Sequence, residues 1–245
     1  MSTDTPIKLL RDIHRLISYH QSIGVESYPT TKGVDSFLNP GPRKTTPPVS
    51  SMDFSLTDIR EELGNCTRCG LAKSRKKIVF GQGGKQPSVF IIAGSPSSDD
   101  DETGEALCGP AGELLTKMLA AIKLTREEVF ITHLVKCIPP DDRPPQKEEI
   151  NTCLPFLYQQ IETCNPDIIC TMGPLAAQTL LRTKDSLFRM RGRFQKLVVN
   201  QNRTFPLLPT MHPAFLLKNP DMKKASWQDL QMLQKRLKEV KAEGF

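Results

Sequence analysis

The chain has 245 residues and a net charge of +6, from 33 lysines and arginines against 27 aspartates and glutamates. Its 38% hydrophobic and 24% charged residues are typical of a soluble globular protein with a substantial core. The longest segments without a charged side chain have 14 residues, which excludes a membrane-spanning helix of roughly 20. The polar N-terminus lacks the apolar core of a signal peptide, so we expect a cytoplasmic protein with no membrane contact.

The charge is distributed unevenly along the chain. Residues 182–245 carry 14 basic and 5 acidic side chains, whereas residues 1–181 carry 19 basic and 22 acidic ones. Lysine and arginine gain affinity for polyanions by releasing counterions from phosphates, so the basic segment indicates a polyanionic partner. A solvated helix face would give the same distribution, and charge alone does not decide between the two.

Two elements are predicted before the main body of the chain. Residues 1–24 contain an amphipathic helix, whose apolar side chains share one stripe and whose first turn suits Pro6. Residues 25–53 mix five prolines with Ser, Thr and Gly and show no period, which indicates a linker. The helix is either an appendage that binds a protein partner through residues 1–50 or an element that docks late in folding.

The body, residues 54–245, alternates short β-branched runs with helical patterns. The expected strands are Val89–Ala93, Val129–Val135, Ile168–Met172 and Phe205–Leu208. The expected helices are Ser55–Leu63, Gly112–Leu124, Lys147–Thr163, Pro174–Leu181 and Ala225–Lys241. This alternation predicts a three-layer α/β/α domain built on a four-stranded parallel sheet.

Functional loops of a parallel sheet gather at the carboxyl ends of its strands. Three conspicuous segments lie there: residues 94–112 after the first strand, the region around His133 at the second, and residues 211–213 after the last. The acidic run Asp99–Glu102 within the first segment is most simply a solvated loop. It also supplies the only dense set of carboxylates near the inferred site.

Seven cysteines in a chain expected to be cytoplasmic favour metal ligands or buried thiols over disulfides. Cys66 and Cys69 form a C-x-x-C pair after a predicted helix, Cys137 follows the second strand, and Cys153 lies in the next helix. This set is compatible with an iron–sulfur cluster, with zinc, or with no metal, although zinc sites usually bring a second close pair. The other cysteines have apolar or small neighbours and are expected to be buried thiols: Cys108, Cys164 and Cys170.

Together with three further motifs, the cysteine pattern resembles the family 4 uracil-DNA glycosylases, the iron–sulfur members of the uracil-DNA glycosylase superfamily. The motifs are Val135-Lys136-Cys137-Ile138-Pro139-Pro140, Arg191-Gly192-Arg193, and His212-Pro213-Ala214 followed by Leu216-Leu217-Lys218-Asn219-Pro220. The resemblance runs from about residue 54 to residue 237, in the family's motif order. It implies a [4Fe–4S] cluster on Cys66, Cys69, Cys137 and Cys153.

The active-site motifs depart from the family pattern. Where the family carries Gly-Glu-x-Pro-Gly, this chain has Gly94 followed by Ser95, which stands nearest the place of the Glu beside the attacking water. Either a nearby carboxylate such as Asp99 substitutes for that Glu, or water attacks unassisted. The base pocket is expected to include Gly94, with Leu107 in place of the aromatic residue that stacks on uracil and His133 in place of the Asn that reads the base edge.

His212 keeps the family residue. A histidine before proline at the end of a strand is often only a capped turn, and its own sequence context does not decide its role. The resemblance implies that His212 stabilises the negative charge that develops on the departing base. No lysine stands where the family would form a Schiff base, so we expect base release without strand cleavage.

DNA-contacting residues are expected on both sides of His212. Arg191 and Arg193 precede it and Lys218 follows it, where basic side chains would bind phosphates without reading sequence. Leu216, together with its neighbour Leu217, is a candidate for the wedge that fills the gap left by an extruded base. Plain core packing explains these leucines equally well.

We therefore predict a monomeric, monofunctional DNA glycosylase that removes uracil or another deaminated base from DNA in base excision repair. The departures in its motifs predict slower uracil release than in a relative with the full motif set. The alternative is a catalytically weak or inactive iron–sulfur module of the same fold that binds nucleic acid. A third interpretation is a zinc-stabilised binding protein.

Overall fold

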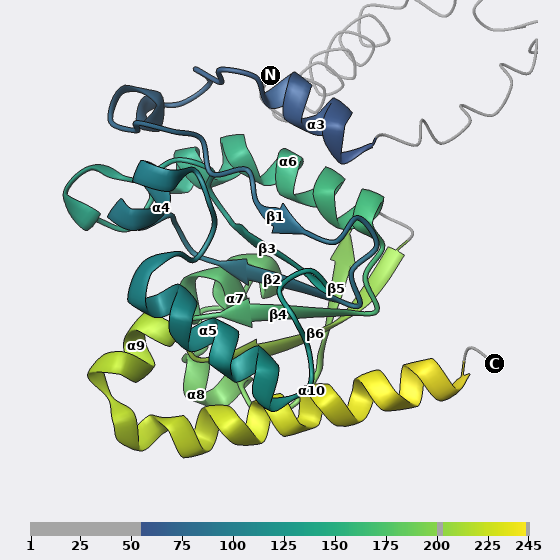
Figure 1. Cartoon of the computed structure of the whole chain (residues 1–245). Coiled ribbons are helices and arrows are strands. Elements are labelled where there is room, and N and C mark those ends of the chain that lie inside the picture. The colour runs from purple at the N-terminus through teal and green to yellow at the C-terminus, as the bar shows by residue number, and fades with distance from the viewer. Residues whose placement is uncertain (1–54, 200–202, 244–245) are drawn as a thin grey trace, which may run out of the picture. The chain divides into compact units, whose positions relative to one another are not determined.

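The computed structural model describes residues 55–199 and 203–243, and the N-terminal helix and linker predicted from the sequence lie outside these ranges. Within them, strands and helices alternate along the chain (Figure 1). The strands expected from the sequence are present as β2 (Val89–Ala93), β3 (Val129–His133), β4 (Ile168–Met172) and β6 (Arg203–Thr210). None of the helices in the described ranges is long and apolar enough to cross a membrane.

The sheet of the described residues has six strands in the order β1-β3-β2-β4-β6-β5. The four expected strands pair in parallel at its centre, while β1 (Gln82–Gly83) and β5 (Gln195–Val199) add antiparallel edges. The prediction of four strands was therefore too low. β1 has only two residues and β5 alternates buried with exposed positions, so neither shows the continuous apolar run of a strand buried on both faces.

Helices cover both faces of this sheet, and every residue of β2, β3 and β4 is buried. Along β2, Val89 and Ile91 contribute to one core, and Phe90 and Ile92 to the other. The helices of the first core are α5 (Gly109–Ala121), α9 (Pro213–Lys218) and α10 (Lys223–Glu243). Those of the second are α3 (Leu56–Leu63), α6 (Lys147–Cys164) and α7 (Pro174–Leu181). Shorter helices complete the chain: η1 (Gly70–Lys73), η2 (Pro140–Asp142), α8 (Leu187–Met190) and η3 (Pro220–Met222).

Helix α5 begins earlier than its apolar pattern indicated. Pro110 stands in its first turn, where the missing backbone N–H removes no helical hydrogen bond, so the helix starts at Gly109 and not at Gly112. It ends before Lys123, whose φ of 62° cannot continue a right-handed helix. The shift brings the start of α5 next to the loop after β2.

The acidic run Asp99–Glu102 is helical, so the prediction of a solvated loop was wrong. It belongs to α4 (Ser98–Thr103), which Ser97 caps by accepting the Asp100 backbone N–H while the Asp100 carboxylate accepts that of Ser97. Asp100 and Asp101 are buried, and backbone N–H groups from other segments also donate to their carboxylates. Those partners come from residues 76–77 and from residue 108, which local sequence does not pair with the run.

Candidate active site and cysteine pocket

The carboxyl ends of the central parallel strands lie at the same end of the sheet, which we call the strand edge. Three of the segments predicted to be functional meet there. Gly94 follows β2, His133 is the last residue of β3, and His212 follows β6. A Cβ atom added to Gly173, after β4, would lie 3.5 Å from the Cβ of His212, so this histidine packs over the end of β4. Gly94, Ser95 and His212 are partly buried, whereas His133 is fully buried beneath this edge.

The backbone of α9 fixes the ring of His212. His212 is the N-cap of this helix, and its Nδ1 accepts a hydrogen bond of 3.2 Å from the backbone N–H of Ala214. Burial lowers the pKa of His212 to about 4, so the ring is neutral near pH 7. Because the accepting nitrogen of a neutral imidazole carries no hydrogen, the proton is on Nε2. His212 therefore presents a neutral N–H donor at the strand edge.

His133 lies beside a buried carboxylate. Its Nε2 is 3.4 Å from Oδ2 of Asp100, and the two side chains are 0% and 1% exposed. Burial, followed by the positive charge of Lys136 and that of His212 when protonated, holds the pKa of His133 well below its ordinary value, so this ring is also neutral. Among the described residues, neither of its nitrogens has a partner at hydrogen-bond geometry.

The carboxylate that lies beside His133 is that of Asp100 and not that of the predicted Asp99. Asp99 is exposed, and its Oδ2 would lie 1.9 Å from a Cβ atom added to Gly109, so it packs against the first residue of α5. Sequence reasoning missed Asp100 because the run offers several consecutive carboxylates. Its place three residues after Ser97 is the capping-box spacing, which is the signal that singles it out.

Leu107, at the position predicted to stack on the base, belongs to the buried core beside Leu115. Its φ of 52° is unfavourable for a branched side chain, and the guanidinium of Arg126 donates to its carbonyl at 3.3 Å. A Cβ atom at Gly112 would lie 2.0 Å from that carbonyl oxygen, so glycine is required there for the close approach. Strained backbone of this kind is typical of functional sites.

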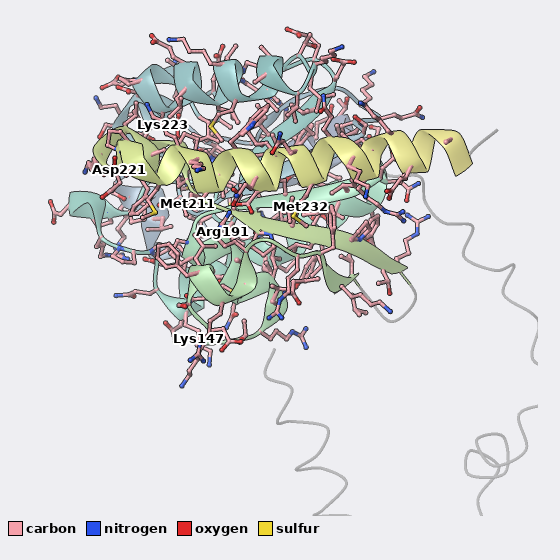
Figure 2. The ribbon with its side chains drawn as sticks, turned by 90° about the horizontal axis from the view of Figure 1, so that it is seen from below. Lys147, Arg191, Met211, Asp221, Lys223 and Met232 are labelled. Atoms are coloured by element: carbon pink, nitrogen blue, oxygen red, sulfur yellow. The ribbon has the colours of Figure 1, made fainter. Side chains whose placement is uncertain are left out.

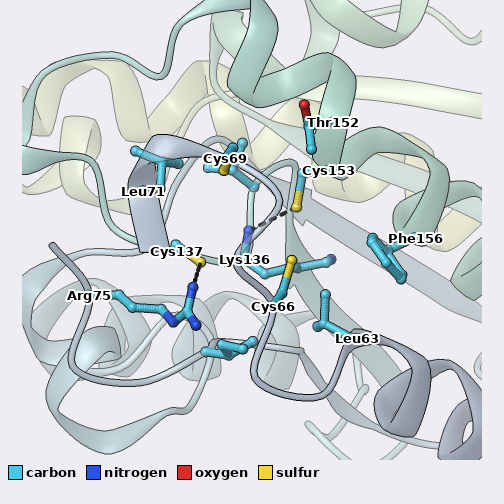
Figure 3. Close-up of a pocket in the computed structure, with 12 residues that line it drawn as sticks. Leu63, Cys66, Cys69, Leu71, Arg75, Lys136, Cys137, Thr152, Cys153 and Phe156 are labelled. Carbon is cyan, nitrogen blue, oxygen red and sulfur yellow. Dashed lines mark hydrogen bonds between the residues drawn. The ribbon is translucent and has the colours of Figure 1, made fainter. Parts of the chain in front are cut away.

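The four cysteines predicted to be ligands line one cavity (Figure 3). Cys66 and Cys69 follow α3, Cys137 follows β3, and Cys153 lies in α6. Apolar side chains from the same elements complete the wall: Leu63, Leu71, Val135 and Phe156. Segments far apart in sequence thus contribute the four thiols to the wall of one cavity.

Nitrogen donors surround these sulfur atoms. The guanidinium of Arg75 donates to Sγ of Cys137 at 3.4 Å, and the backbone N–H of Lys136 donates to Sγ of Cys153 at 3.3 Å. Burial raises the pKa of the Cys137 thiol to about 11. The hydrogen bond and positive charge of Arg75 act in the opposite direction and lower this pKa.

The spacing of the thiols bears on which centre the pocket fits. In the described part of the chain, no three His, Cys, Asp or Glu side chains come close enough to hold a single metal ion. Tetrahedral zinc, with Zn–S bonds of about 2.3 Å, requires a tight group of sulfurs, whereas a cluster with several irons spans a wider cage. Four thiols around one cavity are compatible with such a cluster.

The remaining cysteines occupy two kinds of environment. Cys164 and Cys170 are buried, as predicted, and burial raises the pKa of each to about 12. Cys108 is only partly buried, so the expectation of a buried thiol was wrong there. It is the N-cap residue of α5, and its Sγ lies 3.2 Å from the hydroxyl of Thr103.

Comparison with known proteins agrees with this arrangement. Residues 80–231 match the family described as the uracil DNA glycosylase superfamily. The chain is 36% identical over 184 residues to the type-4 uracil-DNA glycosylase of Saccharolobus solfataricus, covering 73% of this chain and 85% of that protein. It is 34% identical over 183 residues to the Archaeoglobus fulgidus enzyme of the same description, covering 73% and 92%. The chain belongs to the type-4 uracil-DNA glycosylases.

A third relative of this family, the type-4 enzyme of Thermotoga maritima, is 35% identical over 162 residues, covering 66% of this chain and 82% of that protein. The match to the superfamily begins at residue 80, inside the part of the chain where the strands begin. Family membership therefore rests on the same segment that carries the strand edge, and two of the four pocket cysteines, Cys137 and Cys153, lie within it.

The residues predicted to bind DNA divide into exposed and buried ones. Arg193 and Lys218 are exposed. Arg191 lies beside α10 (Figure 2), where its guanidinium pairs with the buried carboxylate of Asp229 at 2.8 Å and donates to the carbonyl of Ala225. This pairing gives Arg191 a structural role, and the prediction that it contacts phosphate is dropped. Its motif partner Arg193 stays a candidate.

The two adjacent leucines of α9 also differ in exposure. Leu216 is 1% exposed and belongs to the core beneath α5 and α10, so it does not serve as a wedge. Leu217 is 43% exposed and its neighbour Phe215 40%. Residues two positions apart do not share a helix face, so these two exposed side chains lie on different sides of α9.

Proposed function

We propose that this chain hydrolyses the N-glycosidic bond of uracil, or of another deaminated base, in DNA, the first step of base excision repair. The type-4 relatives support the reaction class. Within the chain itself, the observation that carries the proposal is the capped ring of His212, a neutral donor fixed by the hydrogen bond from Ala214.

The reaction places negative charge on the departing base. Extruding the nucleotide from the stack makes its glycosidic bond accessible, at a cost of a few kcal/mol. As the bond breaks, water attacks C1′ and electrons move into the base. The Nε2–H of His212 then donates to a carbonyl oxygen of the base, where charge accumulates, and its fixed orientation means that no reorganisation is needed at that moment.

The attacking water is the less defined part of the site. Ser95 follows β2 at the place of the family's Glu, and its hydroxyl positions water without taking a proton from it. Asp99, exposed at the start of α4, stays the proposed carboxylate for this water. Gly94, Leu107 and His133 are proposed to form the base pocket.

We further propose that Cys66, Cys69, Cys137 and Cys153 hold a [4Fe–4S] cluster. When bound, such a cluster supplies a structural link between the segment after α3, the end of β3 and α6, and takes no part in base release. The cavity wall and the N–H donors of Arg75 and Lys136 support the assignment. Arg193, Lys218 and Leu217 are proposed to contact the DNA around the extruded nucleotide.

A second candidate function is favoured by one observation. Leu107 and His133 are buried at the positions where the family stacks and reads uracil. A chain with this pocket closed to bases would be a catalytically weak or inactive iron–sulfur module that binds nucleic acid.

A base-release assay separates the two functions. The substrates are oligonucleotides carrying uracil, hypoxanthine or xanthine, and the control is His212→Ala, with DNA affinity measured alongside. We expect release by the unmodified chain and a loss of about 100- to 1,000-fold in His212→Ala, the usual effect of removing one such donor. If no base is released while DNA binding is retained, the proposed activity is wrong and the chain is the nucleic-acid-binding module.

A further inference from the structure

Lys136 carries a buried side chain that the proposed reaction does not use. It follows β3, directly before Cys137, and is one of the residues that line the cysteine cavity (Figure 3). Only 1% of its surface is exposed. Its backbone N–H donates to Sγ of Cys153 at 3.3 Å, so the chain holds this residue beside two of the proposed cluster ligands.

The hydrogen bonds of the Nζ atom indicate that this side chain is an ammonium ion. Three oxygen atoms surround it: Oγ1 of Thr132 at 2.5 Å, the carbonyl of His133 at 2.9 Å and Oε1 of Gln160 at 2.7 Å. The Thr132 hydroxyl and the Gln160 amide each donate a hydrogen to the carbonyl of Phe80, so the oxygens that face Nζ are acceptors. An ammonium has three N–H donors, one for each acceptor, whereas a neutral amine has one fewer.

Among the amino acids that the structure describes, this charge has no carboxylate partner. The ion pairs there involve other side chains, and the three acceptors around Nζ are neutral groups. An unpaired charge is costly to bury, and buried charges in proteins are normally paired. The place of Lys136 in the cavity wall indicates that its partner is a negative group bound in the cavity.

A [4Fe–4S] cluster is such a group. Four thiolates outweigh the two positive charges of its resting core, so the cluster and its ligands together form an anion. The apolar side chains of the wall cannot offset that charge: Leu63, Leu71, Val135 and Phe156. A buried cation and a buried anion at the same cavity each remove the other's unfavourable isolation.

Two arginines also contact the sulfur atoms, but from more exposed positions. Arg75 donates to Sγ of Cys137 at 3.4 Å and Arg68 to Sγ of Cys66 at 3.5 Å. Arg68 is exposed and Arg75 is half-buried, so water screens their charges. Lys136 is shielded from water, and its charge therefore acts on the cavity with less screening.

We propose that Lys136 is the internal counter-ion of the cluster, a buried positive charge that offsets the negative charge of the iron–sulfur centre and its four thiolates. The inference rests on the proposed cluster and goes beyond the assignment of its ligands. A nearby cation stabilises the more negative state of a redox centre, so Lys136 raises the reduction potential of the cluster. The alternative is a purely structural lysine that ties β3 to α6 through Thr132 and Gln160.

The variant that tests the charge is Lys136→Met, whose side chain is neutral and of similar length. The matched control is Gln160→Met, which removes one acceptor from the same buried network and keeps the ammonium. Lys136→Arg is the conservative variant that keeps a positive charge. A structural tie would be disturbed by both methionine variants, whereas the counter-ion is lost only in Lys136→Met.

The measurement is the reduction potential of the cluster in anaerobically purified full-length protein, from a redox titration followed by EPR. In Lys136→Met the ratio of reduced to oxidised cluster at a fixed potential should fall at least about tenfold, a negative shift of about 59 mV for one electron. One charge has roughly this effect even at about 10 Å with an effective dielectric constant of about 20. Gln160→Met and Lys136→Arg should each change the ratio by less than about threefold, because both keep the charge.

Each outcome decides the inference. An unchanged or more positive potential in Lys136→Met, or an equal negative shift in Gln160→Met or Lys136→Arg, would overturn it. If Lys136→Met holds no cluster, the visible absorption of the other two variants decides: absorption in both supports the counter-ion, and its loss from either one overturns it. Failure of the proposed cluster is distinct, because the unmodified chain itself would then lack visible absorption.

Discussion

The cysteine pocket and the strand edge that carries the histidines were predicted from the same sequence with different success. In the pocket, all four predicted side chains line one cavity. At the strand edge, His212 lies where its motif placed it, but the inward carboxylate is Asp100 and not Asp99. A set of identical ligands such as the four cysteines can be identified from its spacing in the sequence. At the strand edge, the site depends on which of several neighbouring aspartates turns inward, and spacing does not determine that.

The largest expected effect concerns the cysteine pocket and tests whether Cys137 is a cluster ligand. Cys137→Ser removes a proposed cluster ligand and should abolish the visible absorption of anaerobically purified protein, along with most of the soluble yield, because ligation energy is also folding energy. Cys170→Ser is the control, since Cys170 is also buried but is not among the residues that line the cavity. An unchanged spectrum in Cys137→Ser would disprove the ligand assignment.

The next effect tests whether Arg191 stabilises the fold while Arg193 contacts DNA. Arg191→Ala should lower the free energy of unfolding by about 3 kcal/mol, because it leaves the buried Asp229 without its positively charged partner, with only the Thr210 hydroxyl donating to it. Arg193→Ala should leave stability unchanged, weaken DNA affinity and reduce the slope of its salt dependence by about one. Chemical denaturation and salt-dependent binding measure both. The reverse pattern would show that the roles of the two arginines had been exchanged.

The adjacent leucines of α9 allow a similar test, in which Leu216 is expected to stabilise the fold and Leu217 to contact DNA. Leu216→Ala opens a cavity in the core and should cost about 2–5 kcal/mol of stability. Leu217→Ala should change stability little and slow uracil release from duplex more than from single strands, because only duplex requires the gap to be filled. Denaturant titration and the duplex-to-single-strand rate ratio are the measurements. An equal slowing on both substrates would contradict the wedge.

The smallest expected effect is the contribution of the buried His212 to the pH dependence of stability. The pKa of His212 is about 4 in the folded protein and about 6.5 in the unfolded chain, so the unfolded state binds more protons between these values. Stability is fully present above about pH 6.5 and is lost as pH falls, by at most roughly 1.4 kcal/mol per pH unit for this residue. Denaturation curves from pH 6.5 to 5 should be less steep in pH for His212→Ala than for the unmodified chain. Parallel curves would show that His212 is not buried as described.

The sequence by itself determined the features that depend on short-range pattern. The apolar, β-branched runs of the four central strands identified them, because helices on both faces leave few exposed positions in these strands. The cysteine spacing predicted the pocket, and the histidine before Pro213 predicted the capped turn. The N-terminal helix, the linker, the cytoplasmic location and the monomeric state stay predictions.

Only the tertiary structure decided the features that depend on partners distant in sequence. The edge strand β5 is held by pairing with β6, and Arg191 is held by Asp229, 38 residues away. Asp100 and Asp101 are buried in an acidic run because backbone N–H groups of remote segments satisfy their carboxylates. A charged side chain leaves water only where such partners are already in place. Local sequence does not contain those partners, so folding alone determined which carboxylate faces His133.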